Sequence, residues 1–376
     1  MTRIAIGVDI GTTGARAVAA DERGQVVAVR AADYALLTPH PGWTEQDPGE
    51  WWRAAREVLA AAAKASDGEI VGIGLTGQMH GSVFLDRAGD VIRPALLWND
   101  QRTGVQCDEI TERVGTARLV EITGNPALTG FQAPKILWLR DDEPANFERV
   151  DHVLLPKDLV RFRLTGELAT DASDAAGTLL MDLGARTWSD EILDALDLPA
   201  GWFPPVVESP EPTGVVRADL ADELGLPTGL PVAAGGGDNA AAAVGTAVTA
   251  DGIVSSSIGT SGVLFAHTEE RAVDPSGRIH AFAHAVPKKY CLLAVTLSAG
   301  GSLRWWRDVT GIAYDELVAE AAAIPAGSEG LVFLPYLTGE RTPHLDPSAR
   351  GAFVGLTARH SRAHLTRALM EGVLFS

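Results

Sequence analysis

Two loops of nearly the same sequence carry the residues best suited to phosphate chemistry. The first reads DIGTTG at residues 9–14, and the second reads SIGTSG at residues 257–262. Each follows a short apolar run and leads into another, which predicts a strand, a tight turn and a returning strand. Glycines allow positive φ in such a turn and bare its N–H groups, while Thr and Ser add hydroxyl donors. The repeat therefore predicts two phosphate-binding hairpins, one in each half of a duplicated fold.

Only the first of these loops begins with a carboxylate, that of Asp9. Mg²⁺ takes few protein carboxylates and keeps much of its water, so a single Asp beside a phosphate loop suits this ion. The alternative is that Asp9 is a turn residue. The duplication of the loop favours the Mg²⁺ role.

A second carboxylate, Asp238, follows three glycines and precedes the Ala-rich run 240–244. The glycines permit close backbone approach, and a carboxylate there suits a general base that takes a proton from an attacking hydroxyl. The same position suits a helix N-cap. Position alone leaves both roles open.

Two further segments place polar groups beside aromatic rings. Residues 78–81 read QMHG, and residues 98–102 read WNDQR. This combination resembles a sugar pocket, and a purely structural role for His80 is the alternative. Together the two segments predict a sugar-binding site.

The composition excludes several classes of protein. A chain of 376 residues is long enough for two domains, and its net charge of −18 disfavours a nucleic-acid groove or an anionic membrane surface. Binding of an anionic nucleotide stays possible, because it needs only a local set of hydrogen-bond donors. Two cysteines cannot form a disulfide framework, which predicts a reducing cytoplasm. The sequence has no signal-peptide pattern and no apolar run of about 18 residues, so no membrane span is expected.

The elements that must position these residues begin with a β-meander over residues 4–9, 15–20 and 25–29. A helix follows, with Asp47 as N-cap, Pro48 at its first position and Glu50 where a capping box would place it. Strands are expected at 70–76, 82–85 and 231–234. Three antiparallel strands followed by alternating helix and strand are typical of ribonuclease-H-like domains.

The fold class is accordingly α/β, with two ribonuclease-H-like (actin-like ATPase) domains flanking a cleft. We expect an N-terminal domain over residues 1–240 and an incomplete C-terminal domain over residues 241–376. The last helix is predicted from 361 to 375, and the chain ends one residue later.

Other nucleotide motifs are missing from the sequence: the Gly-Lys of a Walker A loop, the protein-kinase motifs, and a GxGxxG that opens a helix.

Several segments together resemble the FGGY carbohydrate kinases. They are the first loop, GQMHG at 77–81, LWNDQR at 97–102, GDNA at 237–240 and LPYLTGERTP at 334–343. Residues 351–371 fit the second family signature. Residues 130–142 fit the first, with Lys135 and Trp138 in place, but Gln132 stands where the family has Pro, Ser or Thr.

The resemblance implies ATP-dependent phosphorylation of a sugar, with D-xylulose favoured by the QMHG loop. It implies that Asp238 is the general base and that Asp9 holds Mg²⁺. The residues implied to meet the sugar are Met79, His80, Asp238 and Asn239, and those implied to bind ATP are Gly11, Thr12, Thr13, Arg16, Thr260, Gly300 and Arg304.

Rival functions stay open at this point. One is a kinase for another ketopentose or a polyol. Another is a non-catalytic sugar-binding remnant, because family members continue past residue 376 with a glycine-rich segment that holds adenosine, and this sequence reads as C-terminally truncated. An actin-like chaperone or filament protein is disfavoured because neither needs a QMHG loop. The sequence does not fix the oligomeric state, and a homodimer is compatible with it.

Overall fold

The computed structural model describes residues 2–346 and 348–376. The chain forms two compact units. The first comprises Met1–Ala250, Thr268–Pro275 and Ala281–Cys291, and the second comprises Asp251–His267, Ser276–His280 and Leu292–Ser376. Among the described residues, no helix is both long and apolar enough to cross a membrane. The predicted α/β class is confirmed, and the boundary expected between residues 240 and 241 stays a prediction.

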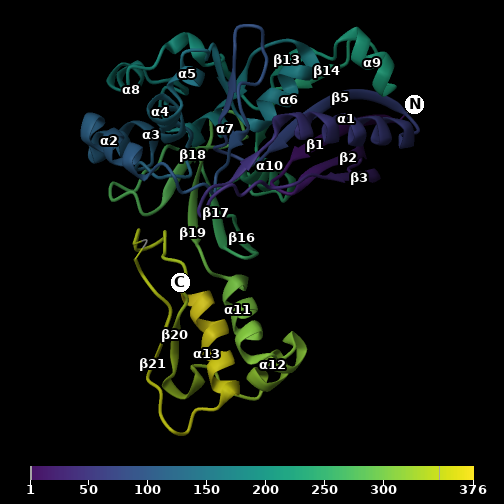
Figure 1. The fold of residues 1–376 in the computed structure, drawn as a ribbon. Helices are drawn as coiled ribbons and strands as arrows, with labels where there is room; N and C mark the ends of the chain where they lie inside the picture. The colour runs from purple at the N-terminus through teal and green to yellow at the C-terminus, as the bar shows by residue number, and fades with distance from the viewer. Residues whose placement is uncertain (1, 347) are drawn as a thin grey trace. The chain divides into compact units, whose positions relative to one another are not determined.

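The first unit is built on a mixed sheet whose strands run in the order β13-β14-β5-β1-β2-β3 (Figure 1). β1, β2 and β3 form the predicted antiparallel meander, and β5 lies parallel to β1 on its other side. The ribonuclease-H-like order is therefore confirmed. The strands are β1 (Arg3–Ile10), β2 (Gly14–Asp21), β3 (Val26–Asp33), β5 (Glu69–Gly77), β13 (Pro212–Val215) and β14 (Pro231–Ala233).

Helix α1 (Pro48–Ala65) packs on the β1-β2-β3 side of the sheet (Figure 1). Asp47 caps it as predicted, since its Oδ1 accepts from the backbone N–H of Gly49 at 2.8 Å. The capping-box role expected for Glu50 is wrong, because its carboxylate accepts from the Arg53 guanidinium instead. Trp51 is fully buried, and such burial contributes roughly 1.5–3 kcal/mol for a large side chain.

Shorter elements surround this sheet. β15 (Gly236–Gly237) pairs in parallel with the last residues of β5, Thr76 and Gly77. The residues before Asp238 therefore lie at the carboxyl end of β5. The other strands are β4 (Glu45–Gln46), β6 (Val83–Leu85), β7 (Ala95–Leu96), β8 (His152–Leu154), β9 (Thr170–Asp171), β10 (Met181–Asp182), β11 (Thr187–Trp188) and β12 (Val206–Val207). The helices are α2 (Gly104–Val114), α3 (Thr116–Thr123), α4 (Gln132–Asp142), α5 (Pro144–Phe147), α6 (Pro156–Thr165), α7 (Ala172–Ala175), α8 (Asp190–Ala195), α9 (Ala218–Leu224) and α10 (Asp238–Gly245), with 3₁₀ turns at Ala176–Thr178 and Ala200–Trp202.

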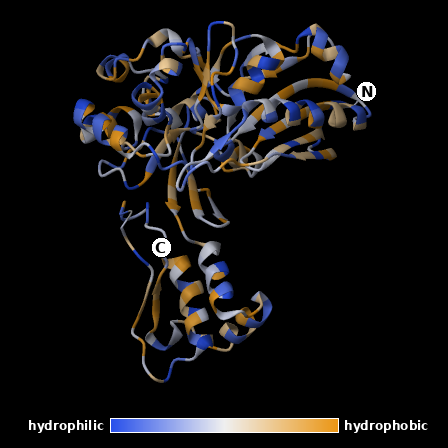
Figure 2. Cartoon of the chain, in the orientation of Figure 1, coloured by the Kyte–Doolittle hydropathy of each residue, from blue (hydrophilic) through white to orange (hydrophobic). Residues whose placement is uncertain are grey.

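The second glycine-threonine loop joins β16 (Val254–Ile258) to β17 (Gly262–Thr268), and these strands pair antiparallel as predicted. The sheet runs in the order β16-β17-β19-β18. The predicted last helix is α13, which begins after Ser361, and hydrophobic residues recur along it in Figure 2. The remaining elements are β18 (His280–Ala283), β19 (Tyr290–Thr296), α11 (Gly300–Thr310), α12 (Tyr314–Ala322), β20 (Val332–Leu334), β21 (Ala352–Val354), α13 (Arg362–Phe375) and a 3₁₀ turn at Ser328–Gly330.

A small core in the second unit holds its three helices together. Its largest members are Trp306, Phe333 and Leu369. The Trp306 indole N–H donates to Thr366 Oγ1 at 2.9 Å, so the polar edge of this buried ring is satisfied. The helix predicted at the end of the chain is therefore part of a packed core.

Candidate active site

The first phosphate loop is a tight turn between β1 and β2, closed by a bond from Gly11 N–H to Gly14 O at 3.1 Å. The expectation that its glycines take positive φ is wrong, since neither Gly11 nor Gly14 lies in the left-handed region. The reason for glycine is close packing. A Cβ on Gly14 would lie 2.7 Å from the carbonyl oxygen of Ala32 on β3. The glycines of the second loop, Gly259 and Gly262, likewise avoid the left-handed region.

Side chains from distant segments hold the tip of this loop. Thr12 O accepts from Gln46 Nε2 at 2.6 Å, and Thr12 Oγ1 accepts from the Trp98 indole N–H at 3.0 Å. Gln78 donates to Gln46 Oε1 at 2.9 Å and lies 3.3 Å from Thr12 Oγ1. The sequence indicated a sugar-pocket environment for the segments of Gln78 and Trp98, whereas these two side chains support the phosphate loop. Gln46 carried no sequence signal for this role.

Asp9 lies at the end of β1, opposite Arg16 of β2. Its Oδ1 atom is buried and has no hydrogen-bond partner among residues 2–346 and 348–376. Burial raises the pKa of Asp9, and the Arg16 guanidinium counteracts part of that rise. An orphaned carboxylate oxygen costs free energy unless it gains a partner, and a cation would supply one. The residue present therefore fits the ion that the sequence predicts.

Asp238 is the first residue of α10, and the N-cap is Gly237. The N-cap alternative for Asp238 is therefore wrong. Its Oδ1 accepts instead from the Asn239 backbone N–H at 2.7 Å and from Asn239 Nδ2 at 2.9 Å. The preceding Gly235 has a φ of +88°, and a Cβ there would lie 2.1 Å from the Leu75 carbonyl oxygen, so glycine is required at this position.

Burial raises the pKa of Asp238 to about 6. The hydrogen bonds from Asn239 oppose this rise, and the Asp9 carboxylate adds to it. A carboxyl with such a pKa is ionised at neutral pH and is still basic enough to accept a proton in a transition state. Asp9, Arg16 and Asp238 line one open cleft of about 850 Å³ within the first unit. Three of the residues predicted from the sequence are thus brought together.

Met79 and His80 follow β5 and lie close to the same loop. Met79 is buried, and a Cβ on Gly237 would lie 2.9 Å from its Cγ atom. His80 has a φ of +68°, and its Nδ1 lies 2.6 Å from the Gly177 carbonyl oxygen. Since a carbonyl only accepts, Nδ1 carries the proton and the acceptor nitrogen of the neutral ring is Nε2. Lys135 Nζ donates to His80 O at 2.8 Å, which supports this strained backbone.

The departure from the family signature at Gln132 has a structural explanation. Gln132 is buried, and its Nε2 donates to Gly81 O at 3.1 Å and to Leu154 O at 3.2 Å. The amide therefore ties the loop after His80 to β8. One side-chain amide thus donates to two backbone carbonyl groups on separate segments.

In the second unit, the predicted nucleotide residues Thr260, Gly300 and Arg304 lie together. The Gly300 N–H donates to Gly259 O at 2.9 Å, and Arg304 Nη2 donates to Thr260 Oγ1 at 2.9 Å. A Cβ on Gly300 would lie 2.5 Å from Gly259 O. The loop carbonyls thus satisfy the first amides of α11, and Gly300 permits the close approach.

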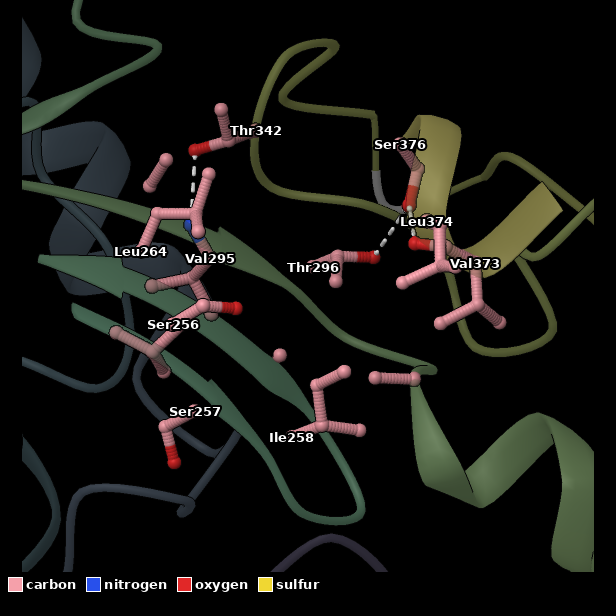
Figure 3. Close-up of a pocket in the computed structure, with 14 residues that line it drawn as sticks. Ser256, Ser257, Ile258, Leu264, Val295, Thr296, Thr342, Val373, Leu374 and Ser376 are labelled. Atoms are coloured by element: carbon pink, nitrogen blue, oxygen red, sulfur yellow. Dashed lines mark hydrogen bonds between the residues drawn. The ribbon is translucent and has the colours of Figure 1, made fainter. Parts of the chain in front are cut away.

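A separate pocket of about 100 Å³ lies between β16, β17, β19 and the last residues of α13 (Figure 3). Val295 N–H donates to Thr342 Oγ1 at 3.2 Å, and Ser376 Oγ lies 3.4 Å from Thr296 Oγ1. Thr260, Gly300 and Arg304 do not line it. The predicted nucleotide residues and this pocket are therefore distinct.

Comparison with known proteins identifies the class of protein. The N-terminal domain of the FGGY family of carbohydrate kinases matches residues 4–245, and the C-terminal domain of that family matches residues 254–376. Together these matches span most of the sequence. The chain belongs to the FGGY family of carbohydrate kinases, as the sequence motifs predict.

Individual relatives give a finer comparison. The xylulose kinase of Lactococcus lactis subsp. lactis is 43% identical over 376 residues, which cover 99% of this chain and 75% of that protein. A crystal structure of a "xyloylose kinase" from Brucella ovis superposes with a TM-score of 0.94 at 42% identity, over 99% of this chain and 77% of that one. Gluconate kinase from Lactobacillus acidophilus gives a TM-score of 0.95 at 28% identity, over 100% and 77% of the two chains. The chain thus spans about three quarters of the length of these relatives.

Proposed function

We propose that this protein is a xylulokinase, which transfers the γ-phosphoryl group of ATP to D-xylulose and forms D-xylulose 5-phosphate and ADP. One structural observation carries the proposed chemistry: the carboxylates of Asp238 and Asp9 line the same cleft, together with the Arg16 guanidinium. The substrate is proposed from the 43% identity to the Lactococcus lactis xylulose kinase.

In the proposed step, Asp238 takes the proton of the sugar 5-hydroxyl while that oxygen attacks the γ-phosphorus. The bond between the γ-phosphorus and the bridging oxygen breaks, and ADP leaves with that oxygen. Such transfers depend mainly on positioning and on stabilisation of the charge on the phosphate oxygens. The phosphate loop with Gly11, Thr12 and Thr13 supplies backbone and hydroxyl donors, and Arg16 supplies positive charge.

Mg²⁺ would be held at Asp9, directly or through water, and would neutralise phosphate charge when bound. In the part of the chain that the structure describes, no group of three or more His, Cys, Asp or Glu side chains is arranged to hold a metal. A single carboxylate fits Mg²⁺ all the same, because this ion usually completes its shell with water and substrate phosphates.

The sugar is proposed to contact Met79, His80, Asp238 and Asn239. The rival substrate class is another ketopentose, a polyol or a sugar acid, and the similarity to gluconate kinase motivates the last of these. Assay of kcat/KM over D-xylulose, D-ribulose, L-ribulose, gluconate and glycerol separates them. D-xylulose is expected to give the highest value, and a preference for gluconate or glycerol would contradict the assignment.

A pH profile tests the base. Because the pKa of Asp238 is about 6 in the protein without substrate, the base is ionised at pH 7.5, and kcat/KM for D-xylulose is expected to fall about tenfold per unit below pH 6. The hydrogen bonds from Asn239 lower this pKa, so Asn239→Ala is expected to move the acid limb to higher pH. An acid limb that stays in place in this variant would argue against Asp238 as the titrating group.

In the second unit, the residues proposed to bind ATP are Thr260, Gly300 and Arg304. Gly300→Ala would drive a Cβ into Gly259 O, so we expect KM for ATP to rise and the melting temperature to fall by several degrees. The control is Gly104→Ala, because a Cβ at Gly104 meets nothing within 4 Å. Equal ATP kinetics and equal melting temperatures in the two variants would count against the proposed role of Gly300.

The partners in this proposal are the sugar and ATP. Both cysteines are free and buried, and we place the enzyme in the cytoplasm, where ATP is supplied. A homodimer is the assembly to test by light scattering. Calorimetric titration with Mg-ATP tests the non-catalytic alternative, because micromolar binding of Mg-ATP would be hard to reconcile with a sugar-binding remnant.

A further inference from the structure

A fully buried carboxylate, Asp171, lies beneath the loop that carries Asp238. Its Oδ2 atom accepts three hydrogen bonds: from Ser173 N–H at 2.9 Å, from Ser173 Oγ at 2.5 Å and from Ser209 Oγ at 2.7 Å. Its Oδ1 atom lies 2.9 Å from Lys157 Nζ. The Asp171 carboxylate therefore fixes the orientation of two serine side chains on separate segments.

Both serines reach the backbone of the glycine segment before Asp238. Ser173 Oγ accepts from Gly237 N–H at 3.1 Å, and the Ser209 carbonyl oxygen accepts from Gly235 N–H at 3.0 Å. Because the Ser173 hydroxyl hydrogen points to Asp171, the oxygen lone pairs are left for Gly237. A hydrogen bond polarised by a neighbouring carboxylate is stronger than one between neutral groups alone.

Asp171 shares the positive charge of Lys157 with two other carboxylates. Lys157 Nζ also lies 2.6 Å from Asp158 Oδ1 and 3.3 Å from Asp174 Oδ2, and all four side chains are fully buried. Burial of ions is costly, and well-packed apolar residues often give equal or greater stability. A purely stabilising role therefore explains this cluster of buried charges poorly. Its contacts with the segment before Asp238 point to a role in holding that segment in place.

The Gly235–Gly237 segment needs external anchors. Glycines have no side chains to lock them in place and have the greatest conformational freedom of any residue. Here they leave room for Ser173 and Met79, since a Cβ on Gly236 would lie 3.3 Å from Ser173 Oγ and one on Gly237 would lie 2.9 Å from Met79 Cγ. The hydrogen bonds to Ser173 and Ser209 thus set where Asp238 begins α10.

We propose that Asp171 is a positioning residue for the phosphoryl transfer: through Ser173 and Ser209 it holds the Gly235–Gly237 segment and thereby aims the Asp238 carboxylate at the sugar hydroxyl. This inference rests on the proposed function, in which Asp238 is the base. A displacement of about 1 Å at the reacting atoms can cost about 10²-fold in rate, so these anchors act on turnover.

Ser173→Ala tests the inference because it removes the acceptor of Gly237 N–H without removing a buried charge. The matched control is Ser189→Ala, since Ser189 is also buried and its Oγ accepts from the Ile192 N–H at the start of α8. Ser173→Ala is expected to lower kcat for D-xylulose by about 10- to 10²-fold, with KM for D-xylulose within about twofold of the unmodified protein. Ser189→Ala is expected to lower the melting temperature without changing kcat.

A second readout needs no activity. Exchange of the Gly237 amide hydrogen is expected to speed up by about fivefold or more in Ser173→Ala and to stay unchanged in Ser189→Ala. If kcat and exchange in Ser173→Ala match those of Ser189→Ala, the positioning role is overturned. If the unmodified protein does not phosphorylate D-xylulose, the proposed function fails instead. The exchange result then decides separately whether Ser173 anchors the loop, and unchanged exchange would overturn the inference.

Discussion

Asp238→Asn is expected to lower kcat for D-xylulose phosphorylation by about 10²- to 10⁴-fold, the usual contribution of a general base. The amide keeps the size and the hydrogen bonds of the side chain but cannot accept the proton of the sugar hydroxyl. D-xylulose binding measured by calorimetry is expected to change little, because Met79, His80 and Asn239 are unaltered.

The control for this variant is Asp190→Asn. Asp190 is the first residue of α8, as Asp238 is of α10, but it is exposed and lies outside the cleft. The control therefore reports any general effect of removing a carboxylate from the first turn of a helix. Turnover by Asp238→Asn within a few-fold of Asp190→Asn would remove Asp238 from the role of base.

Asp9→Asn is expected to give the second large loss. Neutralisation of phosphate charge by a bound metal is worth several kcal/mol, so a variant that holds Mg²⁺ poorly should lose at least about 10²-fold in kcat. The Mg²⁺ concentration for half-maximal activity is expected to rise about tenfold or more, because the weakened site needs more ion. A titration of activity against Mg²⁺ at saturating ATP measures both effects.

Glu69→Gln is the control for Asp9→Asn. Glu69 is an exposed carboxylate on β5, at the opposite end of the same sheet, where it lies beside Arg3. Glu69→Gln removes one negative charge, as Asp9→Asn does, but Glu69 does not line the cleft. If Asp9→Asn keeps the Mg²⁺ dependence of Glu69→Gln, Asp9 does not hold the ion.

Local sequence signals predicted the framework of the first unit well. The meander, the strand 70–76 and the helix capped by Asp47 depend on periodicity and capping within a few residues, and these signals are strong here. Asp9 and Asp238 were singled out from the sequence because each carboxylate lies beside glycines that permit close approach of the backbone, and their roles stay predictions. The family motifs then supplied the roles that position alone left open.

Contacts between segments far apart in the sequence were not predictable in the same way. Gln46 reaches Thr12 from 34 residues away, and Ser173 reaches Gly237 from 64 residues away. Neither residue belongs to a local pattern, and only the folded sheet brings them together. Two glycines of the phosphate loops show the same effect. A Cβ on Gly14 would lie 2.7 Å from Ala32 O on β3, and one on Gly262 would lie 2.7 Å from Thr296 Cγ2 on β19, while neither glycine has a positive φ.

The most direct test of the proposed function is ADP formation by this 376-residue chain with Mg-ATP, in the presence and absence of D-xylulose. The proposal predicts ADP formation that depends on D-xylulose and yields one equivalent of D-xylulose 5-phosphate per ADP. ADP formation that is absent, or equal with and without the sugar, would contradict the assignment.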